Sequence, residues 1–131
     1  MENRSLKKIL VIDDDSDILT IIKYALKKET DLELRFALSG QEGLKEAALF
    51  IPDLILLDVM MPQMDGIMTL KKLHEIDSLK NTAVVFFTAK MTPQEVESYM
   101  HEGIIDVLTK PFDPLKLKQT LLNMWQKYLK R

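Results

Sequence analysis

Short apolar runs recur along the chain, and stretches with helical periodicity separate them. Four runs are candidates for buried strands: Ile9–Ile12, Leu54–Leu57, Ala83–Phe87 and, more weakly, Ile104–Leu108. Three of them are continuously apolar, which is typical of strands covered on both faces of a parallel sheet. A fifth run, Leu32–Ala37, alternates apolar with charged residues. We expect it to be a strand with one wetter face at an edge of the sheet.

An amphipathic pattern follows each of these runs and predicts five helices. The first covers residues 16–28, where apolar side chains recur with the three- and four-residue spacing of one helix face. The starts of the other four are predicted at Ser39, Asp65, Thr92 and Asp113. Glu42 and Glu95 lie three residues after Ser39 and Thr92, which is the spacing of a capping box.

Strand and helix therefore alternate five times. This alternation predicts right-handed βαβ crossovers and an open, doubly wound α/β sheet. The 131 residues fit one ordinary domain, and no internal repeat or linker divides them. We expect a single domain that spans residues 1–131.

Composition then excludes several classes of function. Eighteen Lys and Arg against 20 Asp and Glu give a net charge of −2, which provides no general attraction for nucleic acid. The absence of cysteine excludes disulfides, zinc–thiolate sites and thiol catalysis. No apolar run exceeds five residues, so the sequence predicts neither a membrane span nor a signal peptide. We expect a cytoplasmic protein with no nucleic-acid or membrane partner.

Polar side chains follow the predicted strands at their carboxyl ends, where doubly wound sheets bind ligands. Asp13 and Asp14 follow the first strand, Asp58 the third, Thr88 the fourth and Lys110 the fifth. Carboxylates about 4 Å apart repel by roughly 1 kcal/mol in water and 4 kcal/mol at intermediate dielectric, so this group requires a cation. Oxygen ligands alone favour a hard dication such as Mg²⁺. A lysine and a hydroxyl around one carboxylate then predict phosphoryl transfer with that carboxylate as nucleophile.

Four segments resemble the CheY-like receiver domain of two-component response regulators. They are IDDD at 12–15, LLDVMMPQMDG at 56–66, FFTAK at 86–90 and LTKPFDP at 108–114. The resemblance covers about residues 6–129. It implies a flavodoxin-like (βα)5 sandwich whose five parallel strands have the order 2-1-3-4-5. It also implies a sensor histidine kinase or phosphotransfer protein as phosphoryl donor, and a protein that modifies only itself rather than a turnover enzyme.

The resemblance also assigns roles to the acidic residues. Asp58 matches the phosphorylated aspartate of the family. Asp13 and Asp14 match the acidic pair that binds Mg²⁺, Asp14 directly and Asp13 largely through water. The backbone carbonyl of Met60 would supply a further ligand.

Three residues on the later strands complete the implied site. Thr88 matches the hydroxyl that turns toward the phosphoryl group, and Lys110 matches the lysine that pairs with it. Pro111 matches a proline whose preceding peptide bond is cis. Phosphorylation would then shift a pre-existing equilibrium in the fourth helix and fifth strand.

Departures from the family concern the surface formed by residues 90–107. Val107 replaces the aromatic residue that usually precedes the lysine by three positions, and a β-branched side chain lacks the swing of a ring. The charges that transcription-factor receivers use for dimerisation are also missing. We therefore expect a downstream effector protein, rather than a second copy of the chain, to bind this surface. Met60 and Lys90 provide no group to orient hydrolytic water, which predicts a long-lived phosphorylated form.

An alternative is a haloacid-dehalogenase-like phosphatase that uses Asp13 and Asp15, although this function would leave Asp58 without a role. Other ionisable residues have a structural interpretation. Asp15 and Asp17 are interpreted as charges at a helix N-terminus. His74 and His101 have no ligand partner at convincing spacing and are interpreted as solvated helix residues.

Overall fold

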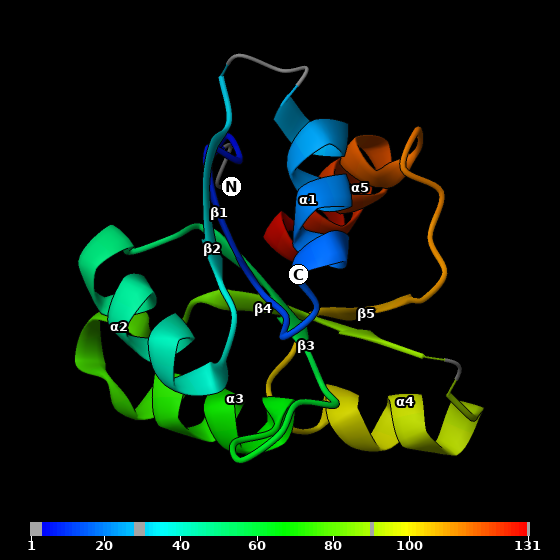
Figure 1. Cartoon of the computed structure of the whole chain (residues 1–131). Coiled ribbons are helices and arrows are strands. Elements are labelled where there is room, and N and C mark those ends of the chain that lie inside the picture. Colours follow the sequence, from blue (N-terminus) through cyan, green and yellow to red (C-terminus); the bar gives the residue numbers. More distant parts are fainter. Residues whose placement is uncertain (1–3, 28–30, 90, 131) are drawn as a thin grey trace.

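The chain folds into five parallel strands that alternate with five α-helices (Figure 1). The computed structural model describes residues 4–27, 31–89 and 91–130. The strands are β1 (Lys8–Ile12), β2 (Glu33–Ala37), β3 (Leu54–Asp58), β4 (Ala83–Thr88) and β5 (Asp106–Thr109). The helices are α1 (Ser16–Lys27), α2 (Gly40–Phe50), α3 (Gly66–Glu75), α4 (Pro93–Met100) and α5 (Leu117–Leu129), with a 3₁₀ turn at Asp77–Leu79.

The sheet has the order β2-β1-β3-β4-β5, so the predicted fold is confirmed. Helices α1 and α5 cover one face of the sheet, while α2, α3 and α4 cover the other (Figure 1). Each face has its own apolar core. Trp125 and Ile22 are buried in the first core, and Phe86 and Leu70 in the second. Every residue of β3 and β4 is buried, as expected for central parallel strands.

The outer strand β2 has one solvent-exposed face, as predicted. Glu33 and Arg35 are exposed, whereas Leu34 and Phe36 are partly buried against the first core. The Arg35 guanidinium lies over the Phe50 ring, 4.8 Å from its centroid, and pairs with Glu46 at 3.2 Å. These side chains stand beside the edge of the sheet.

Two predicted boundaries are wrong at the C-terminal end. Helix α5 begins at Leu117 instead of Asp113, because the Asp113 carboxylate accepts a hydrogen bond from Leu115 N–H and closes a separate turn. Strand β5 begins at Asp106 instead of Ile104, which is buried in the second core before the strand starts.

The predicted helix starts have different outcomes. Thr92 and Glu95 form a full capping box with bonds of 3.1 and 3.0 Å, which confirms the start of α4. Ser39 accepts a bond from Glu42 N–H at 3.1 Å, and no reciprocal bond accompanies it. Residue 28, where the first helix was predicted to end, lies outside the described residues. Across the described part of the chain, every helix is too short or too polar to cross a membrane.

Candidate functional site

The register of the sheet brings the predicted site residues to one edge. Ile12 pairs with Leu57 between β1 and β3, and Asp58 pairs with Phe87 between β3 and β4. Thr88 pairs with Thr109 between β4 and β5. The residues at or just beyond these strand ends therefore face a common space.

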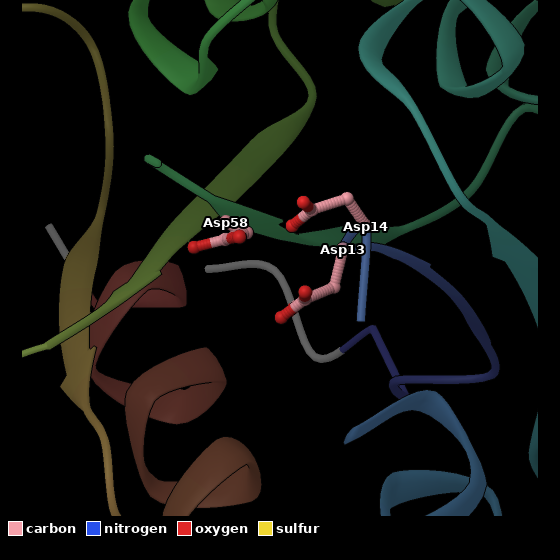
Figure 2. A group of neighbouring side chains, drawn as sticks. All are labelled: Asp13, Asp14 and Asp58. Carbon is pink, nitrogen blue, oxygen red and sulfur yellow. The ribbon is translucent and has the colours of Figure 1, made fainter. Parts of the chain in front are cut away.

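Three aspartates meet in this space (Figure 2). Each of Asp13, Asp14 and Asp58 offers a carboxylate oxygen, and these oxygens lie within 4.8 Å of one another. Asp13 is fully buried, Asp58 is 3% exposed and Asp14 is exposed. The two buried carboxylates are fixed by the sheet, while Asp14 is open to an incoming ligand.

Both oxygens of Asp13 already have hydrogen-bond partners. Asp15 N–H donates to Oδ1 at 2.9 Å, and Lys110 Nζ donates to Oδ2 at 2.9 Å. These bonds fix the carboxylate between the β1–α1 loop and the end of β5.

Lys110 connects two of the aspartates. Its Nζ lies 3.4 Å from Asp58 Oδ1, in addition to the 2.9 Å bond to Asp13. The ammonium also lies 4.7 Å from the centroid of the Phe87 ring, a contact not anticipated from the sequence. Burial on its own lowers the pKa of Lys110, but the hydrogen bond to Asp13 and the charges of both carboxylates outweigh it, so the pKa is raised.

The carboxyl group of Asp58 lies in a negatively charged environment. Burial and the charge of Asp13 raise its pKa from 3.8 to about 7, although Lys110 and the amide of Met60 act in the opposite direction. Met60 N–H donates to Asp58 Oδ1 at 3.4 Å. One lysine therefore does not neutralise the cluster, and a further positive charge would be stabilised there.

The donor set fits a magnesium ion. Octahedral Mg²⁺ binds oxygens at about 2.1 Å, so its ligand oxygens stand roughly 3 to 4 Å apart. The three carboxylate oxygens need only a small adjustment to reach that spacing. Oxygen-only donors, one of them exposed, also agree with an ion that retains water.

Thr88 and Lys110 are held next to each other by the backbone. Lys110 N–H donates to the carbonyl of Thr88 at 2.7 Å, and the Thr88 side chain is buried at the end of β4. The Lys110–Pro111 peptide bond is cis, the form that the resemblance implies. Phe112 then packs edge-on against Phe87 at 5.3 Å.

Residues given a structural interpretation lie outside this cluster. Asp15 accepts hydrogen bonds from Asp17 N–H and Ile18 N–H at the start of α1, so its carboxylate serves the helix. His101 is exposed. The interpretation of His74 as a solvated residue is wrong, because its half-buried ring places Nε2 3.3 Å from the carbonyl of Thr82.

Comparisons with known proteins point to one family. The family model described as response regulator receiver domain matches residues 9–122. The alkaline phosphatase synthesis transcriptional regulatory protein PhoP of Bacillus subtilis is 38% identical over 108 residues, which are 82% of this chain and 44% of PhoP. Response regulator Rre1 of Synechocystis is 32% identical over 117 residues, 88% of this chain and 50% of Rre1. This chain thus spans half or less of the length of these relatives.

A solved structure shows the same fold over its full length. The chemotaxis response regulator CheY4 of Vibrio cholerae superimposes with a TM-score of 0.83 at 28% sequence identity. The match covers 92% of this chain and 99% of CheY4.

Proposed function

The chain belongs to the receiver domains of two-component response regulators, and from this premise we propose that Asp58 is its phosphoacceptor. The observation that carries the proposal is the placement of Asp58. It is a nearly buried carboxylate at the end of a central strand, with two other carboxylates and a lysine directed at the same space.

The donor would be a phosphohistidine of a sensor histidine kinase or a phosphotransfer protein. A carboxylate oxygen of Asp58 attacks phosphorus, the new O–P bond forms, and the P–N bond to the donor imidazole breaks. Lys110 Nζ lies 3.4 Å from Asp58 Oδ1, so it would stabilise the charge that develops on the oxygens of the phosphoryl group. Asp13, Asp14, Asp58 and the Met60 carbonyl would hold Mg²⁺, which supplies further positive charge to the transferring phosphoryl group when bound.

Docking of the phosphoryl donor is supported by an apolar groove along α1. Thr20, Ile21 and Tyr24 line one wall of the groove, and Pro114 and Leu115 line the other. Tyr24 is 67% exposed and Leu115 is 85% exposed, so both side chains are available to a partner. An amphipathic helix that carries the phosphohistidine is the occupant we propose.

The new aspartyl phosphate then recruits the neighbouring donors. Its dianionic oxygens compete with Asp13 for Lys110 and accept a hydrogen bond from the Thr88 hydroxyl. The bond from Lys110 N–H to the Thr88 carbonyl links the backbones of these two residues. The change would pass from Thr88, at the end of β4, toward α4, which has no buried side chain among the described residues.

We propose that an effector protein reads the change on the surface formed by residues 90–107. A groove between α4, β5 and α5 is lined by Met100, Ile105, Asp106 and Tyr128, among others. Lys90 lies outside the described residues. Sedimentation with and without beryllofluoride tests whether a second copy binds instead: a dimer that forms only with beryllofluoride would contradict the effector assignment.

The remaining parts of the proposal follow from the family. One receiver domain would span residues 1–131, act in the cytoplasm, and bind neither nucleic acid nor membrane directly. It would catalyse its own phosphorylation and dephosphorylation and turn over no other substrate.

Labelling with acetyl phosphate tests the phosphoacceptor. The unmodified chain should incorporate acid-labile phosphate in a Mg²⁺-dependent reaction, and Asp58→Asn should abolish it. Asp77→Asn, which changes an exposed aspartate at the other end of the sheet, is the matched control and should label normally. Retained label on Asp58→Asn would contradict the proposal.

A further inference from the structure

The loop between β3 and α3 brings the first residue of α3 against the backbone of the phosphoacceptor. A methyl group built on Gly66 would lie 2.5 Å from the carbonyl oxygen of Asp58 and 2.7 Å from the Cα of Val59. Both distances are far shorter than any non-bonded contact that proteins tolerate. Only a residue without a side chain can therefore begin α3 at this position.

The other helical glycines of the chain differ from Gly66 in what surrounds them. A methyl group on Gly43 would meet Cδ1 of Ile12 and lie 2.8 Å from its Cγ1, and one on Gly40 would meet Thr69 Oγ1 and the side chain of Met64. These contacts involve side-chain atoms, whereas the methyl group on Gly66 would meet the backbone of Asp58 and Val59. Gly66 is thus the helical glycine whose contact falls directly on the backbone of a proposed site residue.

Neither side of the Gly66 contact can move freely. The end of β3 is held by pairing of Asp58 with Phe87 and by the bond from Val59 N–H to the Phe87 carbonyl at 3.3 Å. Helix α3 is held by Leu70 and other fully buried residues. Any added atom would therefore displace the short segment between these two elements.

The segment between β3 and α3 contains the backbone groups of the proposed site, which are the N–H and the carbonyl of Met60. Gly66 N–H closes the segment by donating to the Val59 carbonyl at 2.9 Å, and Met60 N–H donates to the Asp58 carboxylate at 3.4 Å. Within it, Gln63 has a φ of +68°, and Met64 N–H donates to the Pro62 carbonyl at 2.7 Å, which forms a tight γ-turn. A segment with this geometry has little freedom to absorb a displacement.

We infer that Gly66 is a positioning residue for phosphoryl transfer: it lets α3 start directly against Asp58 and so fixes the Asp58 carboxylate relative to the Met60 carbonyl. The inference rests on the proposed role of Asp58. Reaction rates depend steeply on the placement of reacting groups, and an error of 1 Å costs about 100-fold. Relief of the contact requires a shift of roughly half this size, so we expect Gly66→Ala to slow labelling on the order of tenfold.

The experiment compares Gly66→Ala with Leu26→Ala, which truncates a fully buried side chain in the last turn of α1, away from the site. Three quantities are measured for each: the rate of labelling by acetyl phosphate per folded molecule, the ¹⁹F NMR spectrum of the beryllofluoride complex with Mg²⁺, and the thermal midpoint. Gly66→Ala should label about tenfold more slowly and shift or weaken the fluorine signal. Leu26→Ala should lower the midpoint while its labelling rate stays within twofold of the unmodified chain.

The outcomes separate this inference from the proposed function. Absence of label on Asp58 in the unmodified chain would remove the proposed function itself. Normal labelling of the unmodified chain together with a normal rate and fluorine spectrum for Gly66→Ala would overturn only the inference. Equal slowing in Gly66→Ala and Leu26→Ala would also overturn it, because the effect would then follow stability.

A second pair of variants serves if Gly66→Ala does not fold. Asp65 accepts a bond from Met68 N–H at 2.9 Å and caps α3. Asp65→Ala removes this cap and loosens the first turn of α3, whereas Asp65→Asn retains an acceptor and removes the same charge. Asp65→Ala should perturb the fluorine spectrum more than Asp65→Asn. Identical spectra for the two variants would contradict a positioning role for the start of α3.

Discussion

Lys110 is bound more closely to Asp13 than to Asp58, at 2.9 Å against 3.4 Å. The lysine is therefore held beside the proposed phosphoacceptor by a second aspartate. Asp13 is fully buried, so this ion pair is screened little by solvent. The arrangement keeps the ammonium within reach of a new charge on Asp58 while leaving it free to exchange partners.

Removal of the lysine should raise the pKa of Asp58 further. Lys110 acts against the burial and the Asp13 charge that raise this pKa to about 7. In Lys110→Ala that opposing charge is lost, and the carboxyl group should titrate above its value in the unmodified chain. A ¹³C NMR titration of the Asp58 carboxyl measures this directly, and Lys116→Ala, at an exposed lysine, is the control. An unchanged titration midpoint would show that the 3.4 Å contact has no electrostatic effect.

Stability of the metal-free chain should fall between about pH 4 and pH 7. In that range the folded chain retains the proton on Asp58, while the unfolded chain, with a pKa near 3.8, has lost it. Because the folded state binds more protons, the free energy of unfolding decreases as pH rises, by at most about 1.4 kcal/mol per pH unit from this group. Urea unfolding at a series of pH values measures the slope.

Asp58→Asn is the control for this pH dependence. An amide cannot ionise, so the contribution of residue 58 to the slope should disappear in this variant. Saturating Mg²⁺ should reduce the same contribution in the unmodified chain, because a cation favours the ionised carboxylate. The assignment would be refuted by identical slopes in the unmodified chain and in Asp58→Asn.

The phosphorylated form should be long-lived. Met60 is 74% exposed beside the site, and its thioether has no strong donor or acceptor with which to orient an attacking water. Met60→Glu should shorten the lifetime, because a carboxylate can position and activate that water. Loss of acid-labile label over time measures both rates, and decay of the unmodified chain within a few seconds would contradict the prediction.

Loss of the Tyr99 ring should loosen the packing of helix α4 against the sheet. Tyr99 packs edge-on against Phe86 with centroids 5.2 Å apart, and α4 has no buried side chain among the described residues. Tyr99→Ala should therefore increase amide exchange in α4 by tenfold or more, whereas Tyr99→Phe, which retains the ring, should not. Similar exchange in both variants would show that the ring does not anchor the helix.

The strands of the sheet could be predicted because the sequence signals for them are local and strong. Continuous apolar runs identify β3 and β4, and the polar residue directly after each strand identifies the site edge. Asp58, Thr88 and Lys110 could be placed together because parallel strands bring their carboxyl ends to one edge. The start of α5 was misplaced because Asp113 has the chemistry of a helix cap and of a turn, and sequence spacing does not separate the two.

The contacts that tune the site could not be predicted, since they depend on tertiary packing. Neither the distance from Lys110 to Asp13 nor the approach of Gly66 to Asp58 has a signature in spacing. In the sequence we considered only position 107 of β5, where Val107 replaces the usual ring. The structure places the Tyr99 ring, which belongs to α4, in the same apolar cluster as Val107. The sequence of β5 alone does not indicate this neighbour.

Borohydride reduction after phosphorylation tests whether Asp58 is the phosphoacceptor. The reagent converts an aspartyl phosphate to homoserine, so peptide mapping by mass spectrometry identifies the residue that carried the phosphoryl group. We expect homoserine at position 58, formed only in the presence of Mg²⁺ and a phosphoryl donor. Homoserine at position 13, with Asp58 unmodified, would contradict it.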